Sequence, residues 1–414
     1  MACLLHGTHR DAQRDSRHRA LPAARARGVN PAQPVIRWHD ASGLEQVLAW
    51  RSEAGAKPPA RVIEADDTTR ADAAWRLACE GTALLWRGDY HNARQLLQAL
   101  GRRFERSRAR RKWPDDRVAA FNLYRLGQAQ RAHTLGALLV RFDAGWRLLA
   151  GRAPDVANAC TQAWGECPEP CAVPLRDLLG AIGAHQWRER GVEVPALGAR
   201  IHAHYGVFSP VRGEYIDLVA AAPLPADTRL AFDIGTGTGV LAALLARRGV
   251  ERVLATDNAP RALACARDNI ARLQLGDRVE PVEADLFPQG RAPLIVCNPP
   301  WLPGKAASTL ERAVYDPDGA MLRGFLAGLC EHLAPGGEGW LILSDLAEHL
   351  GLRSREELLA AFDAAGLVVI DRLDVAPRHA RTRDANDPLH AARAAEVTSL
   401  WRLAAARDAG FTRL

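Results

Sequence analysis

The second half of the chain alternates regularly between strand-like and helix-like segments. From residue 229 onward, apolar runs such as "RLAFDIG", "VERVLATD" and "APLIVCN" are separated by segments with helical spacing, such as "GVLAALLARRG". Apolar strands between amphipathic helices are typical of a parallel sheet that helices cover on both faces. The pattern therefore predicts an open α/β sheet over residues 229–414, and such sheets bind ligands at the carboxyl edge of their strands.

A glycine-rich turn, "FDIGTGTG" (232–239), joins the first of these strands to its helix. The three glycines that permit a tight turn and a close approach of the backbone to a ligand are Gly235, Gly237 and Gly239. Asp233 precedes them and suits a cationic or amine-bearing ligand better than a pyrophosphate. The next strand ends at Asp257, whose carboxylate can accept hydrogen bonds from both hydroxyls of a ribose. After the third strand, Asp285 is placed to bind an adenine amino group and Leu286 to cover its ring.

The fourth strand ends in "IVCNPPW" (295–301), where a buried run gives way to an amide, two prolines and an indole. An amino group on a base or an amide has a delocalised lone pair and is a poor nucleophile. Two fixed acceptors beside it favour a pyramidal nitrogen and stabilise the charge that develops there. The Asn298 side-chain oxygen and the Pro299 carbonyl oxygen are the candidate acceptors, with Pro300 stiffening the backbone. Trp301 offers a face for stacking a planar group, and this catalytic chemistry needs no metal ion.

Together these motifs resemble those of class I S-adenosylmethionine (SAM)-dependent methyltransferases. "DIGTGTG" is similar to their glycine motif, Asp257 to their ribose-binding acid and Asp285 to their adenine contact. The resemblance implies a Rossmann-like seven-stranded sheet, parallel except for an antiparallel last strand, with SAM as the cofactor. The residues that it implies for SAM binding are Phe208, Glu214, Asp233, Gly235, Thr236, Gly237, Gly239, Asp257, Asn258, Asp285 and Leu286. A dinucleotide-binding dehydrogenase is the alternative, but its glycine spacing fits less well and it leaves "NPPW" unexplained.

Three further resemblances indicate which chemical group receives the methyl group. "NPPW" resembles the [DNS]-PP-[FYW] motif of methyltransferases that act on adenine N6, cytosine N4, guanine N2 or protein glutamine N5. "GVFS" (206–209) resembles the lead-in of ribosomal-RNA guanine-N2 methyltransferases, which carry a degenerate α/β domain before the catalytic one. Pro210, Glu214 and "AVYDPDGAML" (313–322) resemble instead the release-factor glutamine methyltransferases, whose first domain is helical. Trp301 departs from both groups, which usually have Phe and Tyr there.

An RNA base, in ribosomal RNA, is the acceptor that these features favour. A protein glutamine is the first alternative, and a non-catalytic SAM-binding module is the second. The basic run "RRFERSRARRK" (102–112) is either the solvated end of a helix or a patch that contacts RNA phosphates.

The region before the sheet divides into three parts by composition. Residues 1–35 are rich in Arg and lack periodicity, so we expect a disordered head. Residues 36–190 are interpreted as a substrate-recognition domain, and residues 191–228 as a connector that leads into the cofactor site. We expect the recognition domain to be a small α/β domain, with an all-helical domain as the alternative.

Three segments of this region lead to specific expectations. "TALLW" (82–86) predicts a strand, and the spacing after it predicts a helix with Asp89 as its N-cap. "RVAAFNLYRLG" (117–127) is interpreted as a second strand. "GALLVRFDAGWRLLAG" (136–151) is either a hairpin or a helix.

Charge and cysteine content constrain the setting. The chain has a net charge of +6, of which residues 1–33, with six Arg and two Asp, supply +4; charge alone therefore gives only a slight lean toward an anionic partner. No apolar run reaches the roughly 18 residues needed to span a membrane, and no secretory h-region begins the chain, so we expect a cytoplasmic protein with reduced thiols. Cys160, Cys167 and Cys171 cluster in sequence, where a metal or redox role is the less favoured interpretation.

Overall fold

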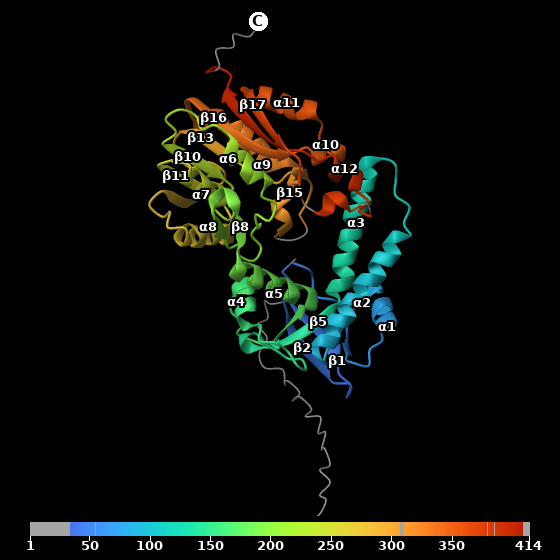
Figure 1. The fold of residues 1–414 in the computed structure, drawn as a ribbon. Coiled ribbons are helices and arrows are strands. Elements are labelled where there is room, and N and C mark those ends of the chain that lie inside the picture. The colour runs from blue at the N-terminus through green and yellow to red at the C-terminus, as the bar shows by residue number, and fades with distance from the viewer. Residues whose placement is uncertain (1–33, 54, 307–309, 379, 385, 409–414) are drawn as a thin grey trace, which may run out of the picture.

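The computed structural model describes residues 34–53, 55–306, 310–378, 380–384 and 386–408. The expected disordered head (1–35) therefore lies outside the described residues, apart from its last two. The described chain contains two seven-stranded sheets, one from each half of the sequence (Figure 1). None of the helices in this part of the chain is long and apolar enough to cross a membrane.

The C-terminal sheet has the predicted α/β architecture. Its strand order is β12-β11-β10-β13-β16-β18-β17. Neighbouring strands are parallel, except that β18 is antiparallel to both β16 and β17. This confirms the expected seven-stranded sheet with an antiparallel last strand. The strands are β10 (Leu230–Ile234), β11 (Arg252–Asp257), β12 (Val279–Glu283), β13 (Ala292–Cys297), β16 (Leu333–Ser344), β17 (Leu367–Val375) and β18 (Thr398–Ala405).

Helices cover both faces of this sheet, because its central strands are apolar on both sides. One core cluster joins α6 and α7 to the sheet, and a second joins α9 and α11 to it. The Ser354 side chain and the Glu357 side chain form a capping box at the start of α11. The helices are α6 (Glu214–Ala221), α7 (Val240–Arg247), α8 (Pro260–Arg272), α9 (Ala320–His332), α10 (Leu346–His349), α11 (Arg355–Ala364) and α12 (His390–Ala394).

The segment "APGGEG" (334–339), which is rich in glycine and contains a proline, lies inside β16. The pairing of β16 with β13 shifts register there, so the strand continues through the irregularity. A Cβ at Gly339 would lie 2.4 Å from Leu329 Cδ2, so a close approach between β16 and α9 requires glycine at this point.

The N-terminal region is α/β, which excludes the all-helical alternative. Its main path runs β1-β2-β7-β5-β4-β3, with β6 paired to β5 as the hairpin that was one of two expectations for 136–151. The strands are β1 (Val35–His39), β2 (Glu45–Trp50), β3 (Arg61–Ala65), β4 (Thr82–Trp86), β5 (Leu138–Asp143), β6 (Arg147–Leu148) and β7 (Cys171–Pro174). The helices are α1 (Ala71–Cys79), α2 (Tyr90–Ala109), α3 (Arg117–Gly136), α4 (Ala157–Trp164) and α5 (Leu175–Arg190). A short antiparallel pair, β8 (Val192–Val194) and β9 (Ala199–Ile201), follows in the connector.

Helices α2 and α3 form a long hairpin at the side of the molecule. Asp89 caps α2 as predicted, by accepting hydrogen bonds from the backbone N–H groups of His91 and Asn92. The strand interpretation of residues 117–127 is wrong, because this segment belongs to the 20-residue helix α3, which Asp116 caps.

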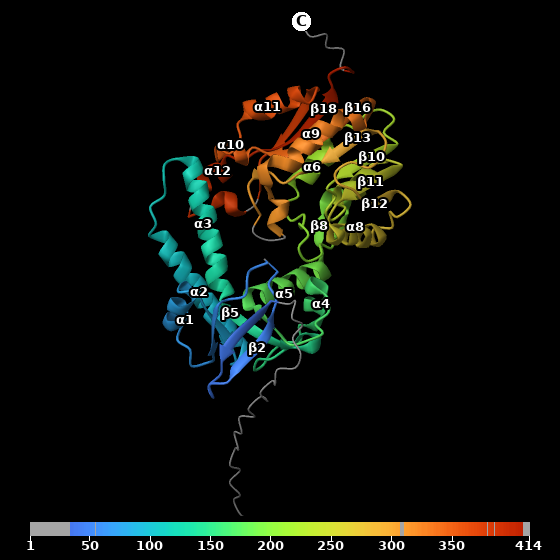
Figure 2. The same ribbon diagram turned by 180° about the vertical axis from the view of Figure 1, so that it is seen from behind.

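The N-terminal half of α3 packs against the C-terminal region, where both views place it beside α10 and α12 (Figures 1 and 2). Phe121 belongs to a core cluster that includes Leu302 and Tyr315. The Arg125 guanidinium lies over the Tyr315 ring, 3.8 Å from its centroid, and pairs with Glu311 at 3.3 Å. The N-terminal region therefore touches the segment that follows the "NPPW" motif.

Candidate functional site

The sheet register brings the glycine turn and "NPPW" together. Ile234 in β10 pairs with Cys297 in β13, so Gly235 and Asn298 leave adjacent strands side by side. In the sheet, β10 lies between β11 on one side and β13 on the other, so the strand order reverses direction at β10. The two motifs thus meet at the topological switch point, where open α/β sheets bind their ligands.

The glycine turn adopts backbone conformations that favour glycine. Gly235, Gly237 and Gly239 have φ values of +70°, +55° and +78°. At Gly237 no atom lies within 4 Å of the position a Cβ would take, so its backbone faces open space. The turn thus leaves room for a ligand to approach the main chain, which fits an adenosine-type cofactor.

Asp233 holds this turn from beneath. Its Oδ2 accepts a hydrogen bond from Thr236 Oγ1 at 2.6 Å and one from the Ala242 backbone N–H at 3.1 Å. The residue is only 1% exposed. Burial raises the pKa of Asp233 to about 6, although these two hydrogen bonds lower it. Asp233 therefore supports the shape of the cofactor loop, whether or not it also contacts the ligand.

We expect Asp233 to give the protein a distinctive pH dependence of stability. Its folded-state pKa lies above the value of 3.8 that applies to an unfolded chain. The contribution of Asp233 to the free energy of unfolding is therefore fully present below about pH 4. It is lost as the pH rises through about 6 and the buried carboxyl ionises. In urea denaturation, the free energy of unfolding of the native chain relative to Asp233→Asn should fall across this window. A difference that grows with pH would contradict the assignment.

Asp257 lies at the end of β11 with both carboxylate oxygens directed toward backbone donors. Oδ2 accepts from the Gly237 N–H at 3.1 Å and Oδ1 accepts from the Ala259 N–H at 2.9 Å. The carboxylate thus ties β11 to the glycine turn, and each oxygen keeps a further lone pair for a ribose hydroxyl.

The remaining cofactor candidates form a second wall. Asn258 donates from Nδ2 to Asp285 Oδ1 at 3.4 Å, a long contact, and the Leu286 carbonyl accepts from Thr256 Oγ1 at 2.6 Å. Leu286 has a φ of +69°, which is unusual for a residue with a side chain. The structure thus places Asp285 and Leu286 beside the end of β11, where the sequence predicted an adenine site.

At "NPPW" the indole and the amide contact one another. Trp301 Nε1 donates a hydrogen bond to Asn298 Oδ1 at 2.9 Å, so one lone pair of the proposed acceptor is already used. The other lone pair remains for a substrate amino group. Pro299 is buried, whereas Asn298, Pro300 and Trp301 are half-buried. The indole therefore orients the amide as well as offering an aromatic face.

The lead-in segment covers this site through Arg212, which the sequence did not single out. The Arg212 guanidinium lies 5.3 Å from the centroid of the Trp301 ring. It also pairs at 3.1 Å with Glu396, which in turn accepts from Ser344 Oγ at 2.7 Å. A planar substrate must therefore share the indole face with Arg212 or displace its guanidinium, because 5.3 Å is too short for a third planar group between them.

Glu214 and Phe208, the two lead-in residues expected at the cofactor, have different surroundings in the structure. Glu214 opens α6 and accepts a hydrogen bond from the Arg378 backbone N–H at 2.6 Å, which ties the lead-in to the segment between β17 and β18. Burial and the nearby Asp233 and Glu214 raise the pKa of Tyr215. Phe208 is half-buried in the segment before α6.

Two more residues at the site were missed. A Cβ at Gly235 would lie 2.5 Å from Met321 Cε, so the Met321 side chain reaches over the glycine turn. Asp316 accepts hydrogen bonds from the backbone N–H groups of Met321 and Leu322 and so holds the start of α9. Only the segment 313–322 gave a signal in the sequence, through its acidic-Pro pattern.

The cysteine cluster lies away from this site, in the core of the N-terminal region. Cys167 Sγ lies 3.8 Å from Cys171 Sγ, and the Cys171 thiol together with Arg51 lowers the pKa of Cys167. Within the described residues no group of three or more His, Cys, Asp or Glu side chains could hold a metal ion.

Comparisons with known proteins match the region that carries both motifs. The family model described as Methyltransferase small domain matches residues 198–368. The release factor glutamine methyltransferase of Cereibacter sphaeroides is 32% identical over 244 residues, which are 55% of this chain and 84% of that protein. The ribosomal protein L11 methyltransferase of Pelotomaculum thermopropionicum is 35% identical over 260 residues, which are 59% of this chain and 71% of that protein. Among solved structures, the ribosomal protein L11 methylase of Lactobacillus delbrueckii subsp. bulgaricus has a TM-score of 0.32 and 18% identity, over 46% of this chain and 76% of that one.

Proposed function

This chain belongs to the SAM-dependent methyltransferases with a methyltransferase small domain, and we propose that it methylates the exocyclic amino nitrogen of a base in RNA. The observation that carries the proposal is the arrangement at the carboxyl edge of β10 and β13. There an amide oxygen, a proline carbonyl and an indole lie next to the glycine turn of the cofactor site.

The residues that would hold SAM are those around the glycine turn. The Gly237 backbone faces open space, Asp257 would accept from the ribose hydroxyls, and Asp285 with Leu286 would enclose the adenine. When bound, SAM supplies an activated methyl group on a sulfonium.

The chain's own part in the reaction is to position and polarise the acceptor. Asn298 Oδ1 and the Pro299 carbonyl accept hydrogen bonds from the substrate NH₂, which favours a pyramidal nitrogen and stabilises its developing positive charge. Trp301 stacks on the base and holds the amide with its oxygen toward the substrate. The buried surroundings of Pro299 and Cys297 keep water away from this edge.

Two observations favour RNA over protein as the substrate. The N-terminal region is an α/β domain, as in the ribosomal-RNA guanine-N2 methyltransferases that share "GVFS", and not the helical domain of release-factor methyltransferases. The hairpin of α2 and α3 is also strongly basic. Both features lie outside the segment that the family model matches.

A protein glutamine is the second candidate acceptor. Its support is the 32% identity to a release factor glutamine methyltransferase, which extends over 84% of that protein. The amide of glutamine is also planar, so the same pair of acceptors would serve it.

Comparative mass spectrometry of a deletion strain and its parent would separate the two candidates. For an RNA enzyme, one methylated nucleoside disappears from the RNA of the deletion strain and returns when the gene is restored. The loss of a methylated glutamine from a protein, with all RNA nucleosides unchanged, would instead establish the second candidate.

A further inference from the structure

The positive charge of the chain is concentrated on the hairpin of α2 and α3. Residues 90–136 contain eleven Arg or Lys and three Asp or Glu, a net charge of +8. The whole chain carries +6, so all other residues together sum to −2. The hairpin is therefore the most basic element of the described residues, while residues 1–33 add a further +4, and its concentration of charge needs a physical reason.

Five of the eleven cations of the hairpin form ion pairs or hydrogen bonds with other side chains, and Arg102 and Arg106 are among those that do not within the described residues. Arg103 pairs with Asp72, Arg125 with Glu311 and Arg131 with Glu105. Arg102 and Arg106 are exposed, and neither forms a hydrogen bond or ion pair with another residue that the structure describes. Like charges held four residues apart on a helix repel one another, so the pair costs stability unless an anion neutralises it.

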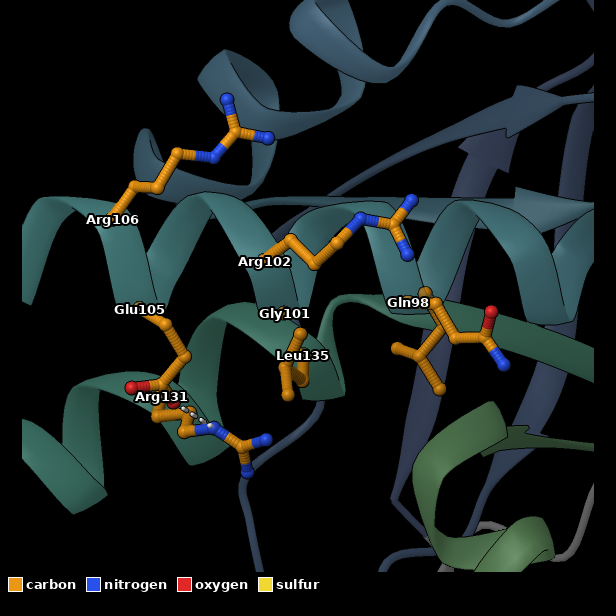
Figure 3. Close-up of a pocket in the computed structure, with 8 residues that line it drawn as sticks. Gln98, Gly101, Arg102, Glu105, Arg106, Arg131 and Leu135 are labelled. Atoms are coloured by element: carbon orange, nitrogen blue, oxygen red, sulfur yellow. Dashed lines mark hydrogen bonds and ion pairs between the residues drawn. The ribbon is translucent and has the colours of Figure 1, made fainter. Parts of the chain in front are cut away.

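Both arginines are among the residues that line a groove at α2 and α3. Figure 3 shows the Arg106 side chain extending from the side of α2 that faces away from α3. The groove has a volume of about 710 Å³, and Leu97, Gly101 and Leu135 form its apolar base. Nothing lies within 4 Å of the position that a Cβ on Gly101 would take, so the groove is open at its centre. The Glu105–Arg131 pair bridges the two helices at the side of the groove, as Figure 3 shows.

We propose that this groove binds the sugar–phosphate backbone of the RNA substrate, an inference that rests on the proposed function. Arg102 and Arg106 lie about 6 Å apart along the helix axis, and guanidinium groups bind phosphate oxygens in a bidentate manner. Gln98, one turn before Arg102, adds an amide donor to the same groove.

The alternative is that Arg102 and Arg106 are simply solvated side chains near the end of α2. This explains their positions less well than the binding of an anion. Cations in the last turn of α2, such as Arg106 and Arg108, are favoured by the helix dipole. Arg102 lies about two turns before the end of the helix, beyond the range of that effect. Binding of an external anion accounts for both arginines and for the groove between the helices.

The location also connects the groove to the catalytic edge. Helix α3 contributes Arg131 to the groove and, about 9 Å along its axis, Arg125 to the contact with Tyr315. Tyr315 pairs through β15 (Tyr315–Asp316) with β14 (Leu302–Pro303), which directly follows Trp301. RNA held in the groove is therefore attached to the helix that contacts the segment following the catalytic motif.

The test is a double variant, Arg102→Ala/Arg106→Ala, with Arg229→Ala/Arg291→Ala as the matched control. The control removes two exposed arginines next to the amino ends of β10 and β13, at the edge of the sheet opposite the site. Binding of fluorescein-labelled oligouridylate, and of RNA from the deletion strain, is measured over a range of salt concentrations. SAM affinity serves as the check that each variant is folded.

We expect the groove variant to bind both RNAs about tenfold or more weakly at low salt. The slope of log affinity against log salt should fall by about 1–2 units, since up to two phosphate contacts are lost. The control should bind as the native chain does. Unchanged affinity and slope in the groove variant would overturn the proposed groove, even if RNA methylation establishes the proposed function.

The opposite failure is distinguishable from this one. If the deletion strain loses a protein methylation and no RNA methylation, the proposed function fails whatever the groove binds. If the groove variant then loses affinity for that protein and keeps its affinity for oligouridylate, the groove is a protein-binding surface and the inference is wrong.

Discussion

Replacing Asn298 with alanine is expected to lower the rate of methyl transfer about 10²–10³-fold. The amide oxygen is a fixed acceptor aimed at a nitrogen on which positive charge develops, and an alanine offers no substitute. The affinity for SAM should change little, because the cofactor residues surround the glycine turn and Asp257. The measurement is the transfer of labelled methyl from SAM to RNA taken from the deletion strain, together with SAM binding by calorimetry.

The aspartate variant is the matched control for this result. Asn298→Asp keeps the size of the side chain and both acceptor lone pairs that matter, and it falls within the [DNS] pattern of the motif. It should retain activity within about tenfold of the native chain, since the acceptor is preserved. A full rate for Asn298→Ala would show that the amide takes no part in the reaction.

The cofactor half of the site was predictable because it is local in sequence. Apart from Phe208 and Glu214 in the lead-in, each candidate cofactor residue lies at or just after the end of a strand, and parallel strands bring those ends to one edge. The register of β10 with β13 then placed Asn298 beside Gly235 without any further information. Strand periodicity and chain order were sufficient for this part.

The side chains that lie over the site, those of Arg212 and Met321, were not predictable in the same way. Arg212 reaches Trp301 from the lead-in, and Met321 reaches Gly235 from α9. These contacts depend on how loops pack, and no pattern in the sequence encodes that packing. The segment after "NPPW" gave a family resemblance but no indication that it would contact α3.

The error over residues 117–127 has a physical cause. Helix α3 packs against α2 on one side and against the cluster of Phe121 and Tyr315 on another. Apolar residues are therefore needed around more of its circumference than in a helix that covers a single face, and the helical period is blurred. A short apolar run of this kind does not distinguish strand from helix, and here the cap at Asp116 was the better signal.

Trp301 allows the two roles of the indole to be separated. Trp301→Ala removes both the stacking face and the donor that orients Asn298, and should lower kcat/KM about 10- to 100-fold, since base stacking on an aromatic side chain is worth about 1–3 kcal/mol. Trp301→Phe keeps a face and removes only the Nε1 hydrogen bond to Asn298 Oδ1. It should therefore lose less activity, equivalent to the loss of one hydrogen bond of about 1 kcal/mol.

The Trp301 variants also show whether Arg212 acts through the indole. In the native chain the guanidinium lies over the indole and is held by Glu396. If Arg212 contacts the base that stacks on the indole, Arg212→Ala raises the KM for RNA and has little effect once Trp301 is already alanine, so the two changes are not additive. Additive losses would mean that Arg212 acts away from Trp301. Equal losses for Trp301→Ala and Trp301→Phe would mean that the indole serves only to orient the amide, and that the base is held by other groups.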